Sequence, residues 1–248
     1  MKISIITAVL NRKNTIGDAI NSLQRQKYKN FEHIIQDGGS NDGTLDVIQR
    51  MKSSNMVVTS ENDSGIYNAI NKGIFRSSGD IVGLMHSDDF FANDYVLSKV
   101  ANMFNDNKID GVYGDLDYVS ASEPSKVIRH WKSGVYRKEL LQKGWMPPHP
   151  TLYLRRGVFD KWGLYDTSYH IAADYDAMLR FLWCGNVRLA YIPEVMVKMR
   201  LGGESNRSIG RILRKSREDY LALKRNKVGG FTTLIRKNTS KFKQLIIK

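Results

Sequence analysis

Short apolar runs alternate with helix-like segments over the first 115 residues of the chain. The runs predict β-strands, because they are short, rich in Ile and Val, and bounded by polar or glycine-containing segments. Between them, apolar residues recur every three to four positions, which predicts amphipathic helices. Strands and helices in alternation favour an α/β fold with a mostly parallel central sheet. The expected strands are residues 2–7, 31–36, 56–59, 81–85 and 111–113, and the expected helices are residues 15–25, 44–51 and 66–75.

The pattern is less regular over residues 116–200, where glycines, the adjacent Pro147 and Pro148, and many aromatic residues occur. We expect loops and short strands laid against the sheet there, with one clear helix at residues 173–183. After Gly202 and Gly203 the composition changes to Lys and Arg with scattered Ile, Leu and Phe. The sequence therefore predicts one α/β domain over residues 1–205, with halves at 1–115 and 116–205, and a basic amphipathic helical tail at 206–248.

Composition excludes several classes of protein. With 42% hydrophobic and 25% charged residues, the chain has the material for a substantial core and is not a disordered sequence. A single cysteine, Cys184, excludes a disulfide framework and a Cys-rich zinc module, and we expect it to be a buried, inert thiol. No apolar run is long enough to span a membrane, and the short run at residues 3–10 reads as a strand rather than a signal peptide.

The net charge of +13 is concentrated at one end of the chain. Residues 207–248 hold 13 Lys or Arg against only Glu218 and Asp219, a net charge of +11, which leaves +2 for the other 206 residues. A nucleic-acid-binding module using the basic tail is one possible interpretation, but the nearly neutral body with acidic loops argues against it. An anionic partner is therefore expected at the tail alone.

Polar and acidic residues follow the predicted strands, where ligands collect in parallel sheets. In the Gly-rich segment 37–44, Asp37 could accept hydrogen bonds from a nucleobase or a ribose. The alternative is a simple turn in which Asp42 or Thr44 caps the next helix. The segment 61–73 has acids before a helix and Lys72 within it, which could reach a phosphate, although a capped surface helix would look the same.

Two further acidic sites stand out. Asp88 and Asp89 directly follow a buried strand, and their repulsion would be relieved by a hard divalent cation bound to a diphosphate. Alternatively, Asp89 or Asn93 caps the following helix and Asp88 is solvated. Asp174 opens the predicted helix at 173–183, where a carboxylate is stabilised by the helix dipole in any case.

Taken together, the order and spacing of these motifs over residues 1–205 resemble the family-2 glycosyltransferases with the GT-A fold. The segments 65–73 and 202–205 look most like bacterial enzymes that build O-antigen or capsule repeat units. The resemblance implies that Asp37 and Asp63 hold uridine, that Asp88 holds the ribose or diphosphate, and that Asp89 ligates Mn²⁺ or Mg²⁺. The implied nucleotide-sugar-binding set is Ala8, Asn11, Arg12, Asp37, Gly38, Asp63, Lys72, Ser87 and Asp88.

Asp174 matches the position of the family's catalytic base, and His149 and Trp145 are candidates for contact with the acceptor. One departure from the family is that His86 or Ser87 stands where an Asp or Asn is common. The Gln-x-x-Arg-Trp signature of processive synthases is absent, so transfer of one sugar per encounter is expected. A metal assists departure of the diphosphate, a carboxylate activates the acceptor hydroxyl, and backside attack on an α-linked UDP-sugar gives a β-linked product.

The resemblance thus implies a cytoplasmic, inverting, UDP-sugar-dependent transferase that extends a polyprenyl-diphosphate-linked saccharide at the inner face of a bacterial membrane. The cationic amphipathic tail would bind the anionic membrane surface. In the alternative, residues 208–227 pack on the catalytic domain and only the last residues are solvated. A sugar nucleotidyltransferase is the nearest rival enzyme, although its basic, Gly-rich signature near the N-terminus is missing.

Overall fold

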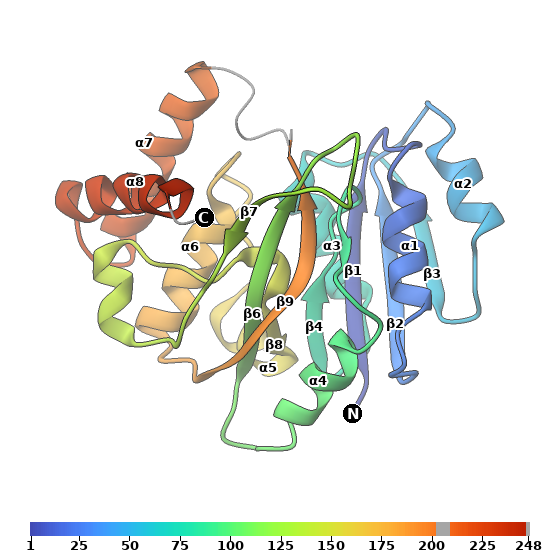
Figure 1. Cartoon of the computed structure of the whole chain (residues 1–248), viewed down its shortest axis with the longest axis horizontal. Coiled ribbons are helices and arrows are strands. Elements are labelled where there is room, and N and C mark those ends of the chain that lie inside the picture. Colours follow the sequence, from blue (N-terminus) through green and yellow to red (C-terminus); the bar gives the residue numbers. More distant parts are fainter. Residues whose placement is uncertain (202–208, 247–248) are drawn as a thin grey trace.

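The computed structural model describes residues 1–201 and 209–246. Within these residues, nine strands form one mixed sheet in the order β3-β2-β1-β4-β8-β6-β9-β5, with β7 paired to β6 (Figure 1). Strands β1 to β4, β6 and β9 run in one direction, and the other three run in the opposite direction. The strands are β1 (Ile3–Val9), β2 (Phe31–Asp37), β3 (Met56–Ser60), β4 (Ile81–Leu84), β5 (Phe90–Phe91), β6 (Gly111–Val119), β7 (Val127–Trp131), β8 (Tyr153–Arg155) and β9 (Leu189–Arg200).

The expected parallel half of the sheet is confirmed. Strand β1 lies between β2 and β4, and β3 pairs on the far side of β2. In this register Val9 is opposite Asp37, and Asp37 is opposite Ser60. The carboxyl ends of β1, β2 and β3 therefore meet at one edge of the sheet, and β4 ends beside β1 at the same edge.

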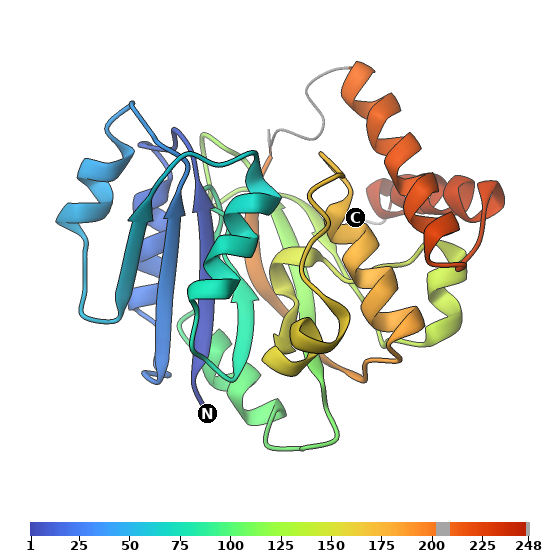
Figure 2. The ribbon, with the colours of Figure 1, turned by 180° about the vertical axis from the view of Figure 1, so that it is seen from behind.

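Helices cover both faces of the sheet (Figures 1 and 2). Helices α1 (Ile16–Gln24) and α4 (Val96–Met103) lie on one face, and α3 (Ile66–Arg76), α5 (Arg156–Trp162) and α6 (Ala173–Leu179) lie on the other. Because side chains of a strand alternate between faces, Ile3 and Ile5 of β1 pack with α1 and α4, whereas Ile6 packs with α3. Helix α2 (Thr44–Arg50) packs against α1.

The second half of the chain differs from the sequence-based expectation. Strand β9 is an integral, parallel member of the sheet rather than a short strand laid against it, and β6, expected at residues 111–113, continues to Val119. Strand β9 is 12 residues long and contains Pro193, and its register with β6 shifts next to that proline, between Gly114 and Asp115. A proline and a bulge interrupt the alternation of apolar and polar residues that indicates a strand. The sequence pattern therefore did not predict β9. The helix expected at 173–183 is α6 followed by a π-helical turn, Arg180–Cys184, and Cys184 is exposed rather than buried.

Two C-terminal helices, α7 (Ile209–Arg225) and α8 (Phe231–Ile246), contact each other and pack on the rest of the molecule. Helix α7 packs on α6, and α8 packs on β7 and on the 3₁₀ helix Lys138–Lys143. Their buried residues Ala222, Leu223, Val228 and Leu234 belong to the same core cluster as α6. Within the described residues, α7 therefore packs on the catalytic domain, which is the alternative that the sequence left open for residues 208–227. None of the described helices combines the length and apolar character needed to cross a bilayer.

Candidate functional site

The carboxyl-end loops of β1 and β2 are joined by a network of hydrogen bonds. Asn11, with a positive φ of 52°, accepts a hydrogen bond from the Asn41 N–H through its side chain, and its own N–H donates to Ser40. The N–H of Arg12 donates to the hydroxyl of Thr44 at 2.8 Å. The predicted ligand residues at 11–12 and the loop 37–44 therefore form one wall of the site, with the half-buried Ala8 at its base.

Asp37 is completely buried and organises its own loop. One of its carboxylate oxygens accepts hydrogen bonds from the N–H groups of Gly39 and Ser40 and from the hydroxyl of Ser60. Asp42 accepts a hydrogen bond from the N–H of Thr44, as the turn interpretation of the segment expects. Direct contact between Asp37 and uridine stays a prediction.

Gly38 and Asp63 lie against each other at the ends of β2 and β3. A Cβ atom at Gly38 would lie 2.4 Å from Asp63 Oδ2, so no larger residue fits unless Asp63 moves. Asp63 is half-buried, and its other oxygen accepts a hydrogen bond from the N–H of Gly65. Lys72 donates to the Asn62 carbonyl at 3.0 Å and lies 3.3 Å from Glu61, so the structure groups it with the β3 end of the site.

The acidic motif after β4 is held by Arg200, the last residue of β9. The N–H of Arg200 donates to Asp89 Oδ1 at 3.1 Å, and its guanidinium donates to the Asp88 carbonyl at 2.7 Å and pairs with Asp18. Arg200 is itself buried. The sequence marks Arg200 as a residue that could approach a diphosphate or lie at the surface, but no local pattern predicts these contacts, because they join residues more than 100 positions apart.

Asp89 does not cap the next helix but is 1% exposed, beside the half-buried Asp88 and the buried Ser87. Its Oδ2 atom has no hydrogen-bond partner among the described residues. Burial raises the pKa of the Asp89 carboxyl well above its usual range, the charge of Asp88 raises it further, and Arg200 opposes both effects. A buried carboxylate oxygen without a partner is costly unless something cationic meets it.

A hard divalent cation fits this acidic pair. Carboxylate oxygens are ligands that Mg²⁺ and Mn²⁺ accept, and Asp89 has one oxygen without a protein partner. In the described ranges, no three or more His, Cys, Asp or Glu side chains are grouped as a metal site. Asp88 and Asp89 would therefore be the protein residues that hold the ion, with further ligands supplied by a diphosphate and water.

Asp174 lies in the first turn of α6, half-buried, and contacts α3. Its Oδ1 atom accepts a hydrogen bond from the N–H of Tyr175 at 2.8 Å and lies 3.3 Å from the hydroxyl of Tyr67. The same hydroxyl donates to the Ile171 carbonyl at 2.6 Å. Burial, followed by the charge of Asp174, raises the pKa of Tyr67 well above its usual range, so Tyr67 stays a neutral donor that orients the carboxylate.

The half-buried His86 and the buried His149 are near Asp174, whose charge acts on both rings. The rings of His86 and His149 are 6.0 Å apart, and His149 Nε2 lies 2.9 Å from the Tyr165 hydroxyl. Burial lowers the pKa of both rings, that of His149 to about 4, although the charge of Asp174 opposes the shift. Both are therefore neutral at pH 7. The charges of both Asp88 and Asp174 act on His86, so this ring is near both the acidic motif and the candidate base.

The two candidate acceptor residues have different surroundings. His149 lies beside Asp174, as described above. Trp145 instead packs edge-on against Tyr113 and stacks on Tyr136, and its indole N–H donates to the Ser133 carbonyl at 2.9 Å. Trp145 is thus used for aromatic packing, and the described contacts give its acceptor role no support. Residues 202–205, which contributed to the family resemblance, lie outside the described residues.

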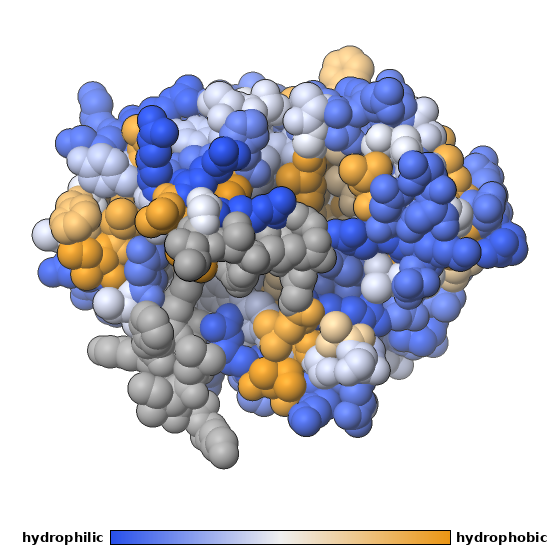
Figure 3. Space-filling view, turned by 90° about the horizontal axis from the view of Figure 1, so that it is seen from above, coloured by the Kyte–Doolittle hydropathy of each residue, from blue (hydrophilic) through white to orange (hydrophobic). Residues whose placement is uncertain are grey.

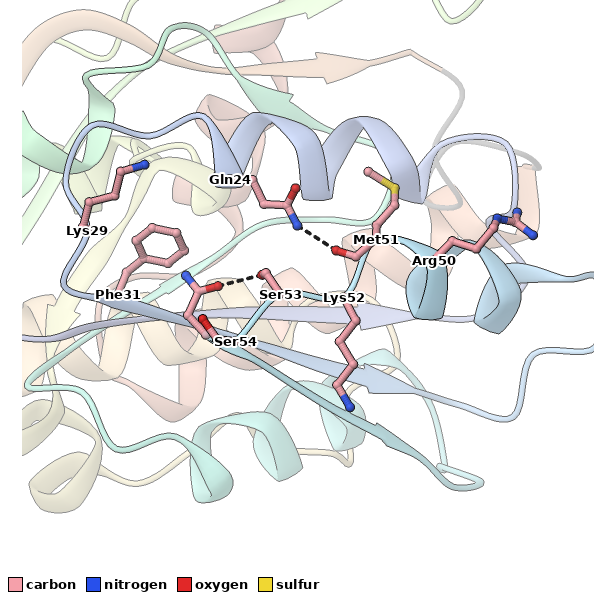
Figure 4. Close-up of a pocket in the computed structure, with 9 residues that line it drawn as sticks. Gln24, Lys29, Phe31, Arg50, Met51, Lys52, Ser53 and Ser54 are labelled. Atoms are coloured by element: carbon pink, nitrogen blue, oxygen red, sulfur yellow. Dashed lines mark hydrogen bonds between the residues drawn. The ribbon is translucent and has the colours of Figure 1, made fainter.

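A pocket of about 620 Å³ lies at the opposite edge of the sheet and is not part of this site (Figure 4). It opens near Phe31, the first residue of β2, and near Ser53 and Ser54, which precede β3. The bonds across it, Gln24 to the Met51 carbonyl and Ser53 to Asn55, connect protein groups to one another. The pocket is therefore far from the carboxyl ends at which the acidic residues gather.

The sequence model of the family described as Glycosyl transferase family 2 matches residues 4–170. The PGL/p-HBAD biosynthesis glycosyltransferase of Mycobacterium tuberculosis is 29% identical over 181 residues, which cover 71% of this chain and 68% of that protein. An uncharacterized glycosyltransferase of Haemophilus influenzae is 24% identical over 247 residues, covering 92% of this chain and 75% of that protein.

Solved structures show the same fold at low sequence identity. S. aureus TarS 1-349 in complex with UDP-GlcNAc has a TM-score of 0.71 and 19% identity, and the match covers 92% of this chain and 66% of that chain. A longer TarS chain gives a TM-score of 0.66, with only 40% of its length covered. Mannosyltransferase PcManGT from Pyrobaculum calidifontis, in complex with GDP-Man and Mn²⁺, gives 0.68 at 15% identity, covering 95% of this chain and 68% of that one.

Proposed function

Because the chain belongs to glycosyl transferase family 2 and has a GT-A-like α/β nucleotide-binding fold, we propose that it is an inverting, metal-dependent hexosyltransferase. It moves one sugar from a UDP-sugar to a polyprenyl-diphosphate-linked saccharide, in the synthesis of an O-antigen or a capsule. The observation that carries the proposal is the pairing of two features at one sheet edge. Asp89 keeps a buried oxygen without a partner among the described residues, and Asp174 is near enough for its charge to act on His86 of the same acidic motif.

UDP is the proposed leaving group, and Mn²⁺ or Mg²⁺ the proposed ion. Structural neighbours support a nucleotide-sugar donor, since TarS is in complex with UDP-GlcNAc and PcManGT with GDP-Man and Mn²⁺. A base bound at the ends of β2 and β3 would meet Gly38 and Asp63 together, because the two residues lie against each other. When bound, the ion stabilises the charge that develops on the leaving diphosphate.

Asp174 is the proposed base. It takes the proton from the acceptor hydroxyl as that oxygen attacks the anomeric carbon from the face opposite the diphosphate, which inverts the centre. Tyr67 fixes one of its oxygens and leaves Oδ2 for the acceptor. The neutral imidazoles of His86 and His149 offer hydrogen bonds without a competing charge, which suits a sugar with many hydroxyl groups.

The decisive test is metal-dependent UDP binding by Asp89→Asn. The substitution keeps the shape of the buried side chain but removes its charge, so Mn²⁺-dependent UDP binding measured by calorimetry should be lost while the fold is retained. Asp94→Asn is the matched control, because Asp94 forms a surface pair with Arg25 and should bind UDP as the wild type does. Binding by Asp89→Asn as tight as that of the wild type, with Mn²⁺ present, would refute the metal assignment.

The membrane is the proposed location of the acceptor. Among the described side chains of α7 and α8, five large apolar ones are exposed, and Figure 3 shows apolar residues among hydrophilic ones at the left of the view. Each basic residue near an anionic surface contributes about 1 kcal/mol to attraction, and this part of the chain carries a net charge of +11. These helices would hold the enzyme at the cytoplasmic face of the membrane. The five residues are Ile212, Leu213, Leu221, Phe231 and Ile235.

Point substitutions test the membrane role better than a truncation. Deleting residues 229–248 would also remove Lys237, whose ammonium pairs with the buried Asp219, and would damage the core. Phe231→Ser with Ile235→Ser should instead weaken sedimentation with anionic liposomes, most clearly at low salt. Phe75→Ser is the matched control, since Phe75 is 87% exposed on α3, away from these helices. Equal sedimentation of the double variant, the control and the wild type would rule out this surface.

A further inference from the structure

Glu218, in the middle of α7, binds the segment of chain that leads into α6. Its side chain is 8% exposed and accepts three backbone hydrogen bonds from three consecutive residues. The N–H of His170 donates to Oε1 at 3.2 Å, and the N–H groups of Ile171 and Ala172 donate to Oε2 at 2.8 and 3.0 Å. Asp174 follows two residues later, in the first turn of α6.

The bond from Ala172 caps α6 from a different helix, and the bonds from His170 and Ile171 hold the segment that leads into α6. The first N–H groups of any helix lack partners within it, and α6 has no side-chain cap of its own, because Ala172 occupies the N-cap position. A charged carboxylate is a strong acceptor for such groups and is favoured by the helix dipole. Glu218 therefore fixes the path of residues 170–172 and the angle at which α6 starts.

Other residues of the C-terminal helices support the same contact. Asn226 donates to Asp176 Oδ1 at 2.8 Å, and Arg225 pairs with Asp166. From the opposite side, Tyr67 of α3 donates to the Ile171 carbonyl. The segment carrying Asp174 is thus bound by α3 through a carbonyl and by α7 through its N–H groups.

We propose that Glu218 is a positioning residue for Asp174, so that α7 is part of the catalytic apparatus rather than only a basic tail. The inference rests on the proposed role of Asp174 as the base. Misplacing a reacting group by about 1 Å can cost about 100-fold in rate. Loss of the three bonds should therefore lower turnover strongly, while the donor site, built on β1 to β4, keeps its affinity.

Three variants separate positioning from simple loss of stability. Glu218→Ala removes all three bonds and should lower kcat at least tenfold, with the Kd for UDP and Mn²⁺ changed less than twofold. Glu218→Gln keeps one carbonyl oxygen for Ile171 and Ala172 and should restore most of the rate. Val228→Ala is the stability control, because Val228 is buried in the turn between α7 and α8 and its N–H donates to the Leu223 carbonyl.

Hydrogen exchange provides a readout that does not require activity. The amides of residues 170–172 should exchange faster in Glu218→Ala than in the wild type, and should keep their protection in Val228→Ala. If they stay protected in Glu218→Ala, the positioning role is wrong, whatever the enzyme does. If protection is lost but kcat is normal, or if Val228→Ala loses as much kcat at the same Tm, the catalytic part is wrong. A wild-type protein without transferase activity but with the expected exchange pattern would instead refute the proposed function.

Discussion

The ion pair between Lys237 of α8 and Asp219 of α7 allows a sharp prediction about what holds the C-terminal helices. Lys237 Nζ lies 2.6 Å from Asp219 Oδ1, and the two side chains are 3% and 2% exposed. The ammonium also lies 3.5 Å from the centre of the Tyr175 ring, next to Asp174. Burial lowers the pKa of Lys237 to about 8, against the opposing charge of Asp219, so the pair is still mostly ionised at pH 7.

Replacing Lys237 with Met leaves Asp219 charged and buried without its main partner. Breaking a buried pair in this way costs about 3–5 kcal/mol. Lys215 lies 3.6 Å from the other oxygen of Asp219 and supplies some compensation, so we expect the lower end, about 3 kcal/mol. For a protein of this size, that corresponds to a fall in Tm of about 6–12 °C.

A double-mutant cycle with Asp219→Asn tests the reasoning. Each single variant should be strongly destabilised in urea unfolding, whereas the double variant, with no buried charge at this pair, should be less destabilised than the sum of the two. We expect a coupling free energy of about 2 kcal/mol. Single variants that each cost less than about 1 kcal/mol, with additive effects in the double, would show that the pair does not hold α8 against α7 and α6.

Three further predictions concern the site and the sheet. Asp174→Asn should lower turnover by about 10²–10⁴ with UDP affinity unchanged, and near-normal turnover would move the base elsewhere. Arg200→Lys keeps the charge but not the fork that joins Asp88 and Asp18, so Mn²⁺-dependent UDP binding in calorimetry should weaken about tenfold. Burial lowers the pKa of His33 to about 3, below its unfolded value of 6.5, so the unfolded state takes up the proton first as the pH falls. Between pH 6.5 and 5, His33 should therefore cost the wild type about 2 kcal/mol of unfolding free energy, and His33→Gln should flatten that slope in urea titrations.

The parallel half of the fold could be predicted from the sequence because each of its elements carries its own signal. Strands β1 to β4 are short apolar runs, and the helices between them show the three-to-four spacing of one buried face. Strand β9 carries no such signal, since Pro193 interrupts it and its buried positions shift at the bulge. Its place beside β6 is decided by pairing between distant residues, which periodicity within one segment does not record.

Some residues of the candidate site could likewise be predicted from the sequence, and others could not. Asp88, Asp89 and Asp174 could be picked out because acids directly after a strand or at a helix start are unusual in combination. The role of His86 could not, because it depends on Asp174 lying across a loop from it. Asp37 illustrates a third case. Its motif indicates both a ligand and a loop organiser, and only the geometry reveals how many of its hydrogen bonds stay within the protein.

Arg200 and Glu218 are 18 positions apart in the sequence, yet they hold different halves of the proposed chemistry. Arg200 binds the acidic motif, whereas Glu218 binds the segment that carries Asp174. Because the two contacts share no residue, a change at Arg200 should act on donor binding and a change at Glu218 on turnover. The chain after β6 therefore does more than close the sheet: β9 supports the donor end of the site and α7 supports the acceptor end. Turnover and donor binding could then change separately, through substitutions on α7 or on β9.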